Sequence, residues 1–254
     1  MLNVRVVKLG GNALDRAAWV ADCARGLKGL EPLIVVHGGG RAVSALSRRL
    51  NLPVEQRDGL RVTTLEVAEV VEMVLGGPMN RVLVAALRAA GLDAIGLSGV
   101  DGGLLTAVTA EGGLGHVGEI AEVRASLLQS LLRAGLTPVI APVAPPAGGN
   151  GVPFNVNADH AAAAIAAAVQ AAELLFVSDV AGVQIDGVAQ TTLPVSDVET
   201  LIERGVATEG MAAKLRAAAR AVGAGVRAVR IGDLAMLASP TAGTRLLSAA
   251  TQLA

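Results

Sequence analysis

The chain has 254 residues, of which 52% are hydrophobic and 1% are aromatic, and its 21 Lys and Arg nearly balance its 22 Asp and Glu. This length allows one large α/β domain or two small lobes, with a core that folds unaided and is built mainly from Ala, Val and Leu. The near-neutral charge, with no basic stripe or polybasic run, argues against nucleic acid or a membrane surface as a partner. A single cysteine, Cys23, excludes an internal disulfide, and we expect it to lie in the core.

The amino-terminal segment has the pattern of a strand and not that of a signal peptide. Residues 1–9 alternate and carry charge at Arg5 and Lys8, so they lack a long apolar region. The longest apolar run, residues 161–169, is too short to span a bilayer. We therefore expect a cytoplasmic protein with no membrane segment.

Short β-branched runs alternate with amphipathic stretches from one end of the chain to the other. In chain order, the expected strands are residues 4–9, 33–37, 94–97, 138–141, 174–178 and 226–231. The first, second and fifth are almost continuously apolar, which indicates parallel strands covered on both faces. Between the strands, apolar residues recur at helical spacing, as in Met211, Leu215 and Ala218. Repeated βα units of this kind predict a mostly parallel α/β fold.

Three of the expected helices begin with a capping signal. Two are capping boxes of the pattern S/T-x-x-E, at Thr63 and Glu66 and at Ser196 and Glu199. The third is Asp159, which precedes an Ala-rich helix and is expected to cap it.

Three glycine clusters are expected to follow a strand and precede a helix, at residues 8–12 (KLGGN), 37–41 (HGGGR) and 96–99 (GLSG). In a parallel sheet such turns gather at the carboxyl edge of the strands, where ligands bind. Glycines there let backbone N–H groups approach an anion, and the next helix adds its positive end. Most single glycines at such turns serve only the turn. Two consecutive units, one of them preceded by Lys8, predict a phosphate site.

Common nucleotide fingerprints do not fit this chain. The P-loop pattern G-x-x-x-x-G-K-[ST] occurs nowhere. A G-x-G-x-x-G match at Gly113, Gly115 and Gly118 is followed by alternating residues instead of a helix, so we interpret it as the tip of a β-hairpin.

Two lysines are candidates for the predicted phosphate site. Lys8 ends an apolar strand directly before Gly10 and Gly11. Lys214 lies one turn into a helix, at the border between its apolar stripe and solvent. The ordinary alternative for either lysine is a solvated side chain, and the functional one is an ammonium group at an anion site.

The densest polar cluster is residues 155–159 (NVNAD), between a strand and the Ala-rich helix. Its side chains can cap that helix, or they can supply amide hydrogen bonds and a carboxylate to a site. Arg61 is expected to open a helix after a turn, where its guanidinium is either solvated or binds a carboxylate. His37 follows an apolar strand and is expected to have a buried partner. No pair of histidines has the spacing of metal ligands.

Taken in order, these motifs resemble those of the amino acid kinase family, and most closely those of the acetylglutamate kinases. The resemblance covers nearly the whole chain and runs through residues 7–11, 36–40, 58–63, 96–99, 115–118, 154–159, 177–182, 209–214 and 243–245. It implies a three-layer open sandwich with a mostly parallel sheet and two lobes. Residues 1–170 would bind the acyl amino acid and dimerise, and residues 171–254 would bind ATP. The implied activity is ATP-dependent phosphorylation of the side-chain carboxylate of N-acetyl-L-glutamate, in arginine biosynthesis.

The resemblance also implies roles for single residues. Lys8 and Lys214, with the amides of Gly11 and Gly39, would stabilise the transferring phosphoryl group, and Asp159 would orient the lysines. The implied substrate-binding residues are Gly39, Gly40, Arg61, Asn155 and Asn157. The implied nucleotide-binding residues are Gly10, Asp179, Val180, Gly182, Glu209, Gly210 and Met211. No metal is held by the protein alone, because Mg²⁺ would be carried by ATP. Glu209 stands where family members commonly have a glycine.

Two other functions stay open at this point. One is a sister kinase acting on aminoadipate or glutamate linked to a carrier protein, against which the intact residues 37–40 and Arg61 argue. The other is a catalytically silent amino-acid sensor on the same fold, against which the two lysines argue. The apolar stretch 67–84 is expected to form a homodimer face or to be buried within one subunit. Arginine-inhibited family members resemble rings joined by a helix ahead of the first strand, and no such helix precedes Val4, so we expect insensitivity to arginine.

Overall fold

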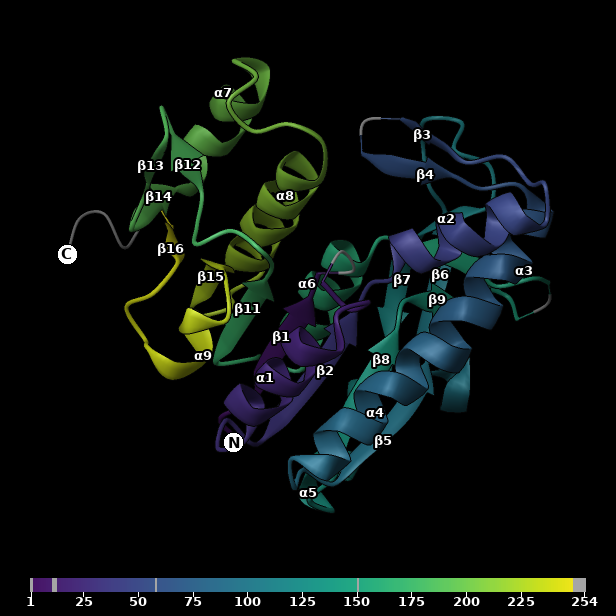
Figure 1. Ribbon diagram of the computed structural model, residues 1–254, viewed down its shortest axis with the longest axis horizontal. Coiled ribbons are helices and arrows are strands. Elements are labelled where there is room, and N and C mark those ends of the chain that lie inside the picture. The colour runs from purple at the N-terminus through teal and green to yellow at the C-terminus, as the bar shows by residue number, and fades with distance from the viewer. Residues whose placement is uncertain (1, 11–12, 58, 150, 249–254) are drawn as a thin grey trace.

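The computed structural model describes residues 2–10, 13–57, 59–149 and 151–248 and contains one large sheet with helices on both faces (Figure 1). The eight strands of this sheet are β1 (Arg5–Leu9), β2 (Leu33–His37), β5 (Ala94–Ser98), β8 (Thr137–Ala141), β11 (Glu173–Val177), β14 (Thr192–Pro194), β15 (Val229–Gly232) and β16 (Thr244–Leu247). They lie in the order β14-β16-β15-β11-β1-β2-β8-β5, with only β15 and β16 antiparallel. The sheet is therefore mostly parallel, as predicted, and β1 lies near its centre.

Helices cover both faces because successive side chains of the central strands point to opposite sides. In β1, Val7 shares a core cluster with α1, α4 and α9, whereas Val6 shares another with α5, α6 and α8. This gives the three layers that the sequence predicts. These helices are α1 (Ala17–Leu27), α4 (Asn80–Ala89), α5 (Ala125–Arg133), α6 (Ala158–Ala168), α8 (Glu209–Gly223) and α9 (Ala235–Ala238).

A smaller sheet and two hairpins complete the structure. The smaller sheet has the order β6-β7-β10-β9, and the hairpins are β3-β4 and β12-β13. Their bounds are β3 (Glu55–Arg57), β4 (Leu60–Val62), β6 (Leu105–Thr109), β7 (Val117–Val123), β9 (Val143–Ala144), β10 (Phe154–Val156), β12 (Gln184–Ile185) and β13 (Val188–Ala189). The remaining helical elements are α2 (Gly40–Arg49), α3 (Leu65–Val74), η1 (Leu75–Met79), η2 (Asp101–Gly103), η3 (Val195–Asp197) and α7 (Val198–Glu203).

The elements α3, η1 and α4 form one interrupted helix. The break is a π-helical turn that contains Pro78, whose ring and missing N–H disturb a regular α-helix. Residues 65–89 are long and apolar enough to cross a membrane, by length and composition alone. In this fold the helix contributes buried side chains such as Val70 and Leu83 to the core. The core helix of a folded protein meets the same criterion of length and composition as a membrane span.

The predicted strands are all confirmed, with ends displaced by at most three residues. The interpretation of the G-x-G-x-x-G match as a hairpin tip is also confirmed, because Gly113 and Gly115 lie in the turn between β6 and β7 and have positive φ. Cys23 is buried in the core, as expected. The predicted division at residues 170 and 171 falls within one continuous sheet, since β1 pairs with β11 along its whole length.

Two predicted helix caps are displaced by one or two residues. The cap of α3 is Thr64, whose Oγ1 accepts from Val67 N, and not Thr63, which is fully buried. The cap of α6 is Asn157, whose Oδ1 accepts from the N–H groups of residues 159 and 160. Asp159 lies inside the first turn of α6 instead, and its carboxylate contacts Lys8 and Lys214.

Three further predictions are wrong in detail. Ser196 does not cap α7, because the short helix η3 intervenes and Ser196 Oγ bonds Asp197. Arg61 does not open a helix but lies in β4. The glycine cluster 96–99 is followed by η2 and a strand, and it does not line the site described below.

Candidate active site

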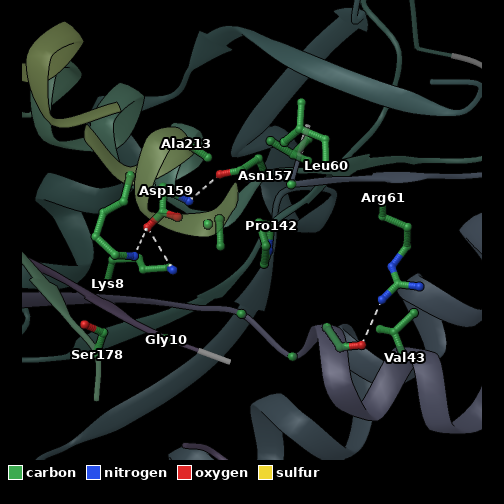
Figure 2. Close-up of a pocket in the computed structure, with 18 of the residues that line it drawn as sticks. Lys8, Gly10, Val43, Leu60, Arg61, Pro142, Asn157, Asp159, Ser178 and Ala213 are labelled. Atoms are coloured by element: carbon green, nitrogen blue, oxygen red, sulfur yellow. Dashed lines mark hydrogen bonds and ion pairs between the residues drawn. The ribbon is translucent and has the colours of Figure 1, made fainter. Parts of the chain in front are cut away.

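Two lysines and an aspartate from three separate elements meet beyond the carboxyl end of β1. Asp159 Oδ1 lies 2.8 Å from Lys8 Nζ and 3.4 Å from Lys214 Nζ (Figure 2). All three residues are buried, with 6 to 7% of their surface exposed. Two positive charges and one negative charge leave this cluster with a net positive charge that bulk water screens weakly.

The fold explains how these three side chains meet. Lys8 points to the face covered by α6 and α8 because it alternates with Val7 and Leu9, which pack on the opposite side. Asp159 lies in the first turn of α6, and Lys214 lies in the second turn of α8. Because these helices pack on one another, their side chains reach the end of β1 together. The solvated alternative for the two lysines is therefore wrong.

Burial and mutual attraction set the charges of the cluster. Burial lowers the pKa of Lys8 from 10.5 to about 8; attraction to Asp159 opposes this fall, and repulsion by Lys214 adds to it. For Asp159, burial alone would raise the pKa, but the two ammonium groups outweigh it and hold the pKa below its ordinary value. At neutral pH, Lys8 is mostly protonated and Asp159 is ionised.

The cluster lies at one end of a cavity of about 390 Å³. The amino-terminal ends of α2, α6 and α8 all line this cavity. Helix amino termini carry unpaired N–H groups and a partial positive charge, so each of them favours an anion. The turn formed by Gly38, Gly39 and Gly40 packs its backbone closely against the side chain of Leu75. A Cβ on Gly39 would come within 2.5 Å of Leu75 Cδ2, so this position requires glycine. Three helix ends and a net positive cluster make this cavity suited to bind an anion such as phosphate.

Arg61 lies in the same cavity, well away from Lys8 and Asp159 (Figure 2). Its Nη2 donates to Gly40 O at 2.8 Å and to Ser44 Oγ at 2.7 Å. Its Nη1 is buried and has no hydrogen-bond partner among the described residues. Burial, and secondly repulsion by Arg48, lower the pKa of Arg61. A guanidinium with a free buried N–H group is suited to bind a carboxylate.

The region around Arg61 combines an amide with apolar walls. Asn155 Nδ2 donates to Thr63 Oγ1 at 3.0 Å, which ties the end of β10 to the residue after β4. The apolar walls of the cavity are formed by Ala13, Val43, Leu60, Val71, Leu75, Val117 and Pro142. This part of the cavity therefore offers polar anchors at its edge and an apolar surface for the body of a small ligand.

Most of the predicted site residues lie together in this cavity. They are Lys8, Gly10, Gly39, Gly40, Arg61, Asn155, Asn157, Asp159, Asp179, Val180, Gly210, Met211 and Lys214. The side-chain oxygen of Asn157 is engaged in capping α6, so only its amide group stays free for a ligand. Gly182 does not line the cavity, and a Cβ there would come within 2.7 Å of Thr244 Oγ1. Gly11 and the side chain of Glu209 lie outside the described part of the structure.

Sequence reasoning missed several residues of the cavity. Ser178 lines it and directly follows β11, as Gly10 follows β1. The rule that strand carboxyl ends carry the site was sufficient to find Ser178. Gln56, Leu60 and Val71 carried no such signal, because they lie on the β3-β4 hairpin and on α3, whose packing the sequence pattern does not specify.

The chain matches the model of the amino acid kinase family over residues 3–233. The chain belongs to the amino acid kinase family. Two curated relatives are both named acetylglutamate kinase. The relative from Roseiflexus sp. (strain RS-1) is 46% identical over 233 residues, covering 90% of this chain and 88% of that protein. The relative from Methanopyrus kandleri is 47% identical over 242 residues, covering 91% and 95%.

Two solved structures share the fold of this chain. The crystal structure of smu.665 from Streptococcus mutans UA159 has a TM-score of 0.85 with 28% identity, and the match covers 97% of this chain and 99% of that one. Carbamate kinase from Giardia has a TM-score of 0.72 with 15% identity, which shows the fold alone. These similarities agree with the open α/β sandwich.

Proposed function

We propose that this protein is an acetylglutamate kinase, which transfers the γ-phosphoryl group of ATP to the side-chain carboxylate of N-acetyl-L-glutamate in arginine biosynthesis. The observation that carries this proposal is the two-ended cavity. Lys8 and Lys214 form a positive cluster at one end, and Arg61 holds a free guanidinium nitrogen away from it. The identity of 46 to 47% with curated acetylglutamate kinases supports the same substrate.

A ligand with two carboxylates suits this arrangement. Arg61 and Asn155 would bind the α-carboxylate and the amide of the substrate, with the amides of Gly39 and Gly40 close by. The side-chain carboxylate would then face the lysine cluster, where phosphoryl transfer is favoured. The apolar walls would contact the methyl of the acetyl group and the methylene groups, which have no polar atoms.

The chemistry requires charge stabilisation and no general base. A carboxylate with a pKa near 4 is already ionised at neutral pH, so one of its oxygens attacks the γ-phosphorus directly while the bond from that phosphorus to the leaving oxygen of ADP breaks. The obstacle is the approach of two anions. Lys8 and Lys214 would neutralise the phosphoryl oxygens, Asp159 would hold both lysines in place, and the amides of Gly11 and Gly39 would donate hydrogen bonds.

The nucleotide would bind on the side of the cavity formed by residues after β11 and by the start of α8. On this assignment Gly10, Asp179, Val180, Gly210 and Met211 border ATP. Gly182 and Glu209 would act at its outer edge. The amino-terminal lobe, residues 1–170, would then hold the amino-acid substrate and the carboxy-terminal lobe, residues 171–254, would hold ATP.

Mg²⁺ would accompany ATP and neutralise charge on its phosphates. The described residues contain no group of three or more His, Cys, Asp and Glu placed to hold a metal ion. Asp159 is engaged by two lysines. Phosphate oxygens and water would therefore supply most of the Mg²⁺ ligands, which is the usual arrangement for this ion.

We further propose a cytoplasmic homodimer that uses the interrupted helix α3–η1–α4 as its interface. Leu65, Met73 and Val82 on this helix are each more than half exposed, so a partner subunit would bury apolar surface here, and two-fold pairing of identical surfaces is the commonest arrangement of oligomers. Met73→Asp should convert the dimer to a monomer in light scattering. Val188→Asp, at an exposed apolar residue outside this helix, should leave the mass unchanged. A monomeric wild-type protein would refute this assignment.

The activity itself is tested by trapping the product. The acyl phosphate reacts with hydroxylamine to give a hydroxamate that is measured by colour, so the assay detects carboxylate phosphorylation specifically. We expect hydroxamate formation with ATP, Mg²⁺ and N-acetyl-L-glutamate, and much less with glutamate, which lacks the acetyl group. Absence of hydroxamate with N-acetyl-L-glutamate would refute the proposed substrate.

A further inference from the structure

A buried histidine–asparagine pair lies beside the glycine turn of the cavity, and the chemistry above does not use it. His37 ends β2 and is completely buried, and Asn80 begins α4 and is 1% exposed. Asn80 Nδ2 lies 3.1 Å from His37 Nε2, and His37 Nδ1 lies 2.9 Å from Gly38 O. Hydrogen bonds thus connect α4 to the first glycine of the turn.

The surroundings determine the orientation of both side chains. Asn80 Nδ2 also lies 2.9 Å from Val139 O and 3.5 Å from Leu97 O. If the amide were flipped, its oxygen would face these two carbonyl oxygens with no hydrogen between them. Asn80 therefore donates to Nε2 of His37, and the proton of the ring is on Nδ1, which donates to Gly38 O. Burial lowers the pKa of His37 to about 4, so the ring stays neutral and keeps this tautomer at neutral pH.

One atom of the pair carries a cost for stability. Asn80 Oδ1 is buried and has no hydrogen-bond partner among the described residues, which carries a desolvation penalty. The amide lies directly against Gly96, where a Cβ would overlap its oxygen. Gly96 must therefore be glycine for Asn80 to enter, which explains this glycine although it does not line the cavity. An unsatisfied buried group of this kind requires a reason other than stability.

The geometry of the peptide unit supplies that reason. Gly38 C=O and Gly39 N–H belong to one planar peptide unit and point in opposite directions. Gly38 N–H donates to Leu9 O at 3.1 Å, so Gly38 is held on its other side as well. Holding Gly38 O consequently fixes the direction of Gly39 N–H, which belongs to the helix amino terminus that lines the cavity.

We propose that His37 and Asn80 are positioning residues that orient the Gly39 amide toward the phosphoryl group during transfer. This inference rests on the proposed kinase function for the identity of the anion, but the hydrogen-bonded chain itself does not depend on it. Because a preorganised donor acts mainly in the transition state, its loss should lower kcat more than it raises KM.

Two substitutions of His37 separate this role from simple filling of space. The amide nitrogen of Asn occupies the place of Nδ1, which bonds Gly38 O, whereas that of Gln occupies the place of Nε2. We expect His37→Asn to keep kcat within about tenfold of wild type and His37→Gln to lower it about a hundredfold, each with KM values within about threefold. A role in packing alone predicts the reverse order, because Gln is closer to His in size. Equal losses in the two folded variants, or a smaller loss in His37→Gln, would overturn the proposal.

Gly96→Ala tests the same chain of contacts from its far end. The added methyl group would displace the Asn80 amide, so we expect a fall in kcat like that of His37→Gln. Gly223→Ala is the matched control, because a Cβ there meets nothing within 4 Å and kcat should not change. Thermal unfolding of each variant verifies that it is folded. Wild-type kcat in folded Gly96→Ala would contradict the proposed role of Asn80.

A readout independent of catalysis distinguishes failure of this inference from failure of the proposed function. The NMR shifts of the Gly38 carbonyl carbon and the Gly39 amide report the hydrogen bond directly. We expect both to move in His37→Gln and in Asn80→Ala, and to stay close to wild type in His37→Asn. If the wild-type protein does not phosphorylate N-acetyl-L-glutamate, these shifts still test the pair. Unchanged shifts in His37→Gln would refute it.

Discussion

Replacement of Asp159 by Asn removes the only negative charge of the lysine cluster without changing the size of the side chain. In the wild-type protein the pKa of Lys8 is about 8, so about nine-tenths of Lys8 is charged at pH 7. Asp159 raises that pKa and Lys214 lowers it. Without Asp159 the pKa of Lys8 must fall, and a fall of two units would leave only about a tenth of Lys8 charged at pH 7.

We therefore expect Asp159→Asn to lower kcat/KM at pH 7 by about tenfold, which corresponds to about 1.4 kcal/mol of transition-state stabilisation. The dependence of kcat/KM on pH provides the specific test, because kcat/KM reports the ionisation of groups in the free enzyme. Activity requires protonated Lys8, so it is lost as pH rises through the pKa. The alkaline limb of the pH profile of kcat/KM should therefore have its midpoint near pH 8 in the wild-type protein and at lower pH in Asp159→Asn. Acidification should partly restore the activity of Asp159→Asn.

The matched control is Glu173→Gln, which removes the partner of buried Arg230 at the opposite end of β11. Both variants should lose stability, by up to about 3–5 kcal/mol, because each leaves buried cations without their carboxylate. Only Asp159→Asn should move the alkaline limb. If the limb stays near pH 8 in Asp159→Asn, or moves equally in Glu173→Gln, then Asp159 does not control the charge of Lys8.

Three further predictions follow from the same geometry. Lys8→Ala and Lys214→Ala should each lower kcat by at least about a hundredfold with the fold intact by circular dichroism, and near-normal turnover in both would contradict the mechanism. Arg61→Ala should raise KM for N-acetyl-L-glutamate far more than it lowers kcat, because binding a non-reacting carboxylate is uniform binding; a selective fall in kcat would assign Arg61 to the chemistry. Since the pKa of His37 is about 4 when folded and 6.5 ordinarily, the unfolded chain binds the extra proton, and the unfolding free energy should fall by up to about 3 kcal/mol as pH falls from 6.5 to 4. Urea titrations should show a smaller fall in His37→Asn.

Local patterns predicted the order of the elements well, because they depend on neighbours in the chain. The continuous apolar runs marked the buried strands, and the spacing of apolar residues marked helices such as α8. Errors arose where two local signals competed. Thr63 and Thr64 can both cap a helix, and the choice between them depended on burial of Thr63 against β10. Arg61 was placed in a helix because the short strand β4 is stabilised by its hairpin partner and not by its own pattern.

The amino-acid pattern alone predicts that Lys8 lies near the end of a buried parallel strand that precedes glycines, and hence that an anion site lies at that sheet edge. Alternation along β1 and the conformational freedom of glycine are local properties, so they are visible without the fold. The tertiary structure decided which groups complete the site. Lys214 meets Asp159 across 55 residues, and Asn80 meets His37 across 43. Neither contact has a sequence period, because each arises from helices packed on the sheet, whose buried polar side chains must find partners wherever the packing brings them together.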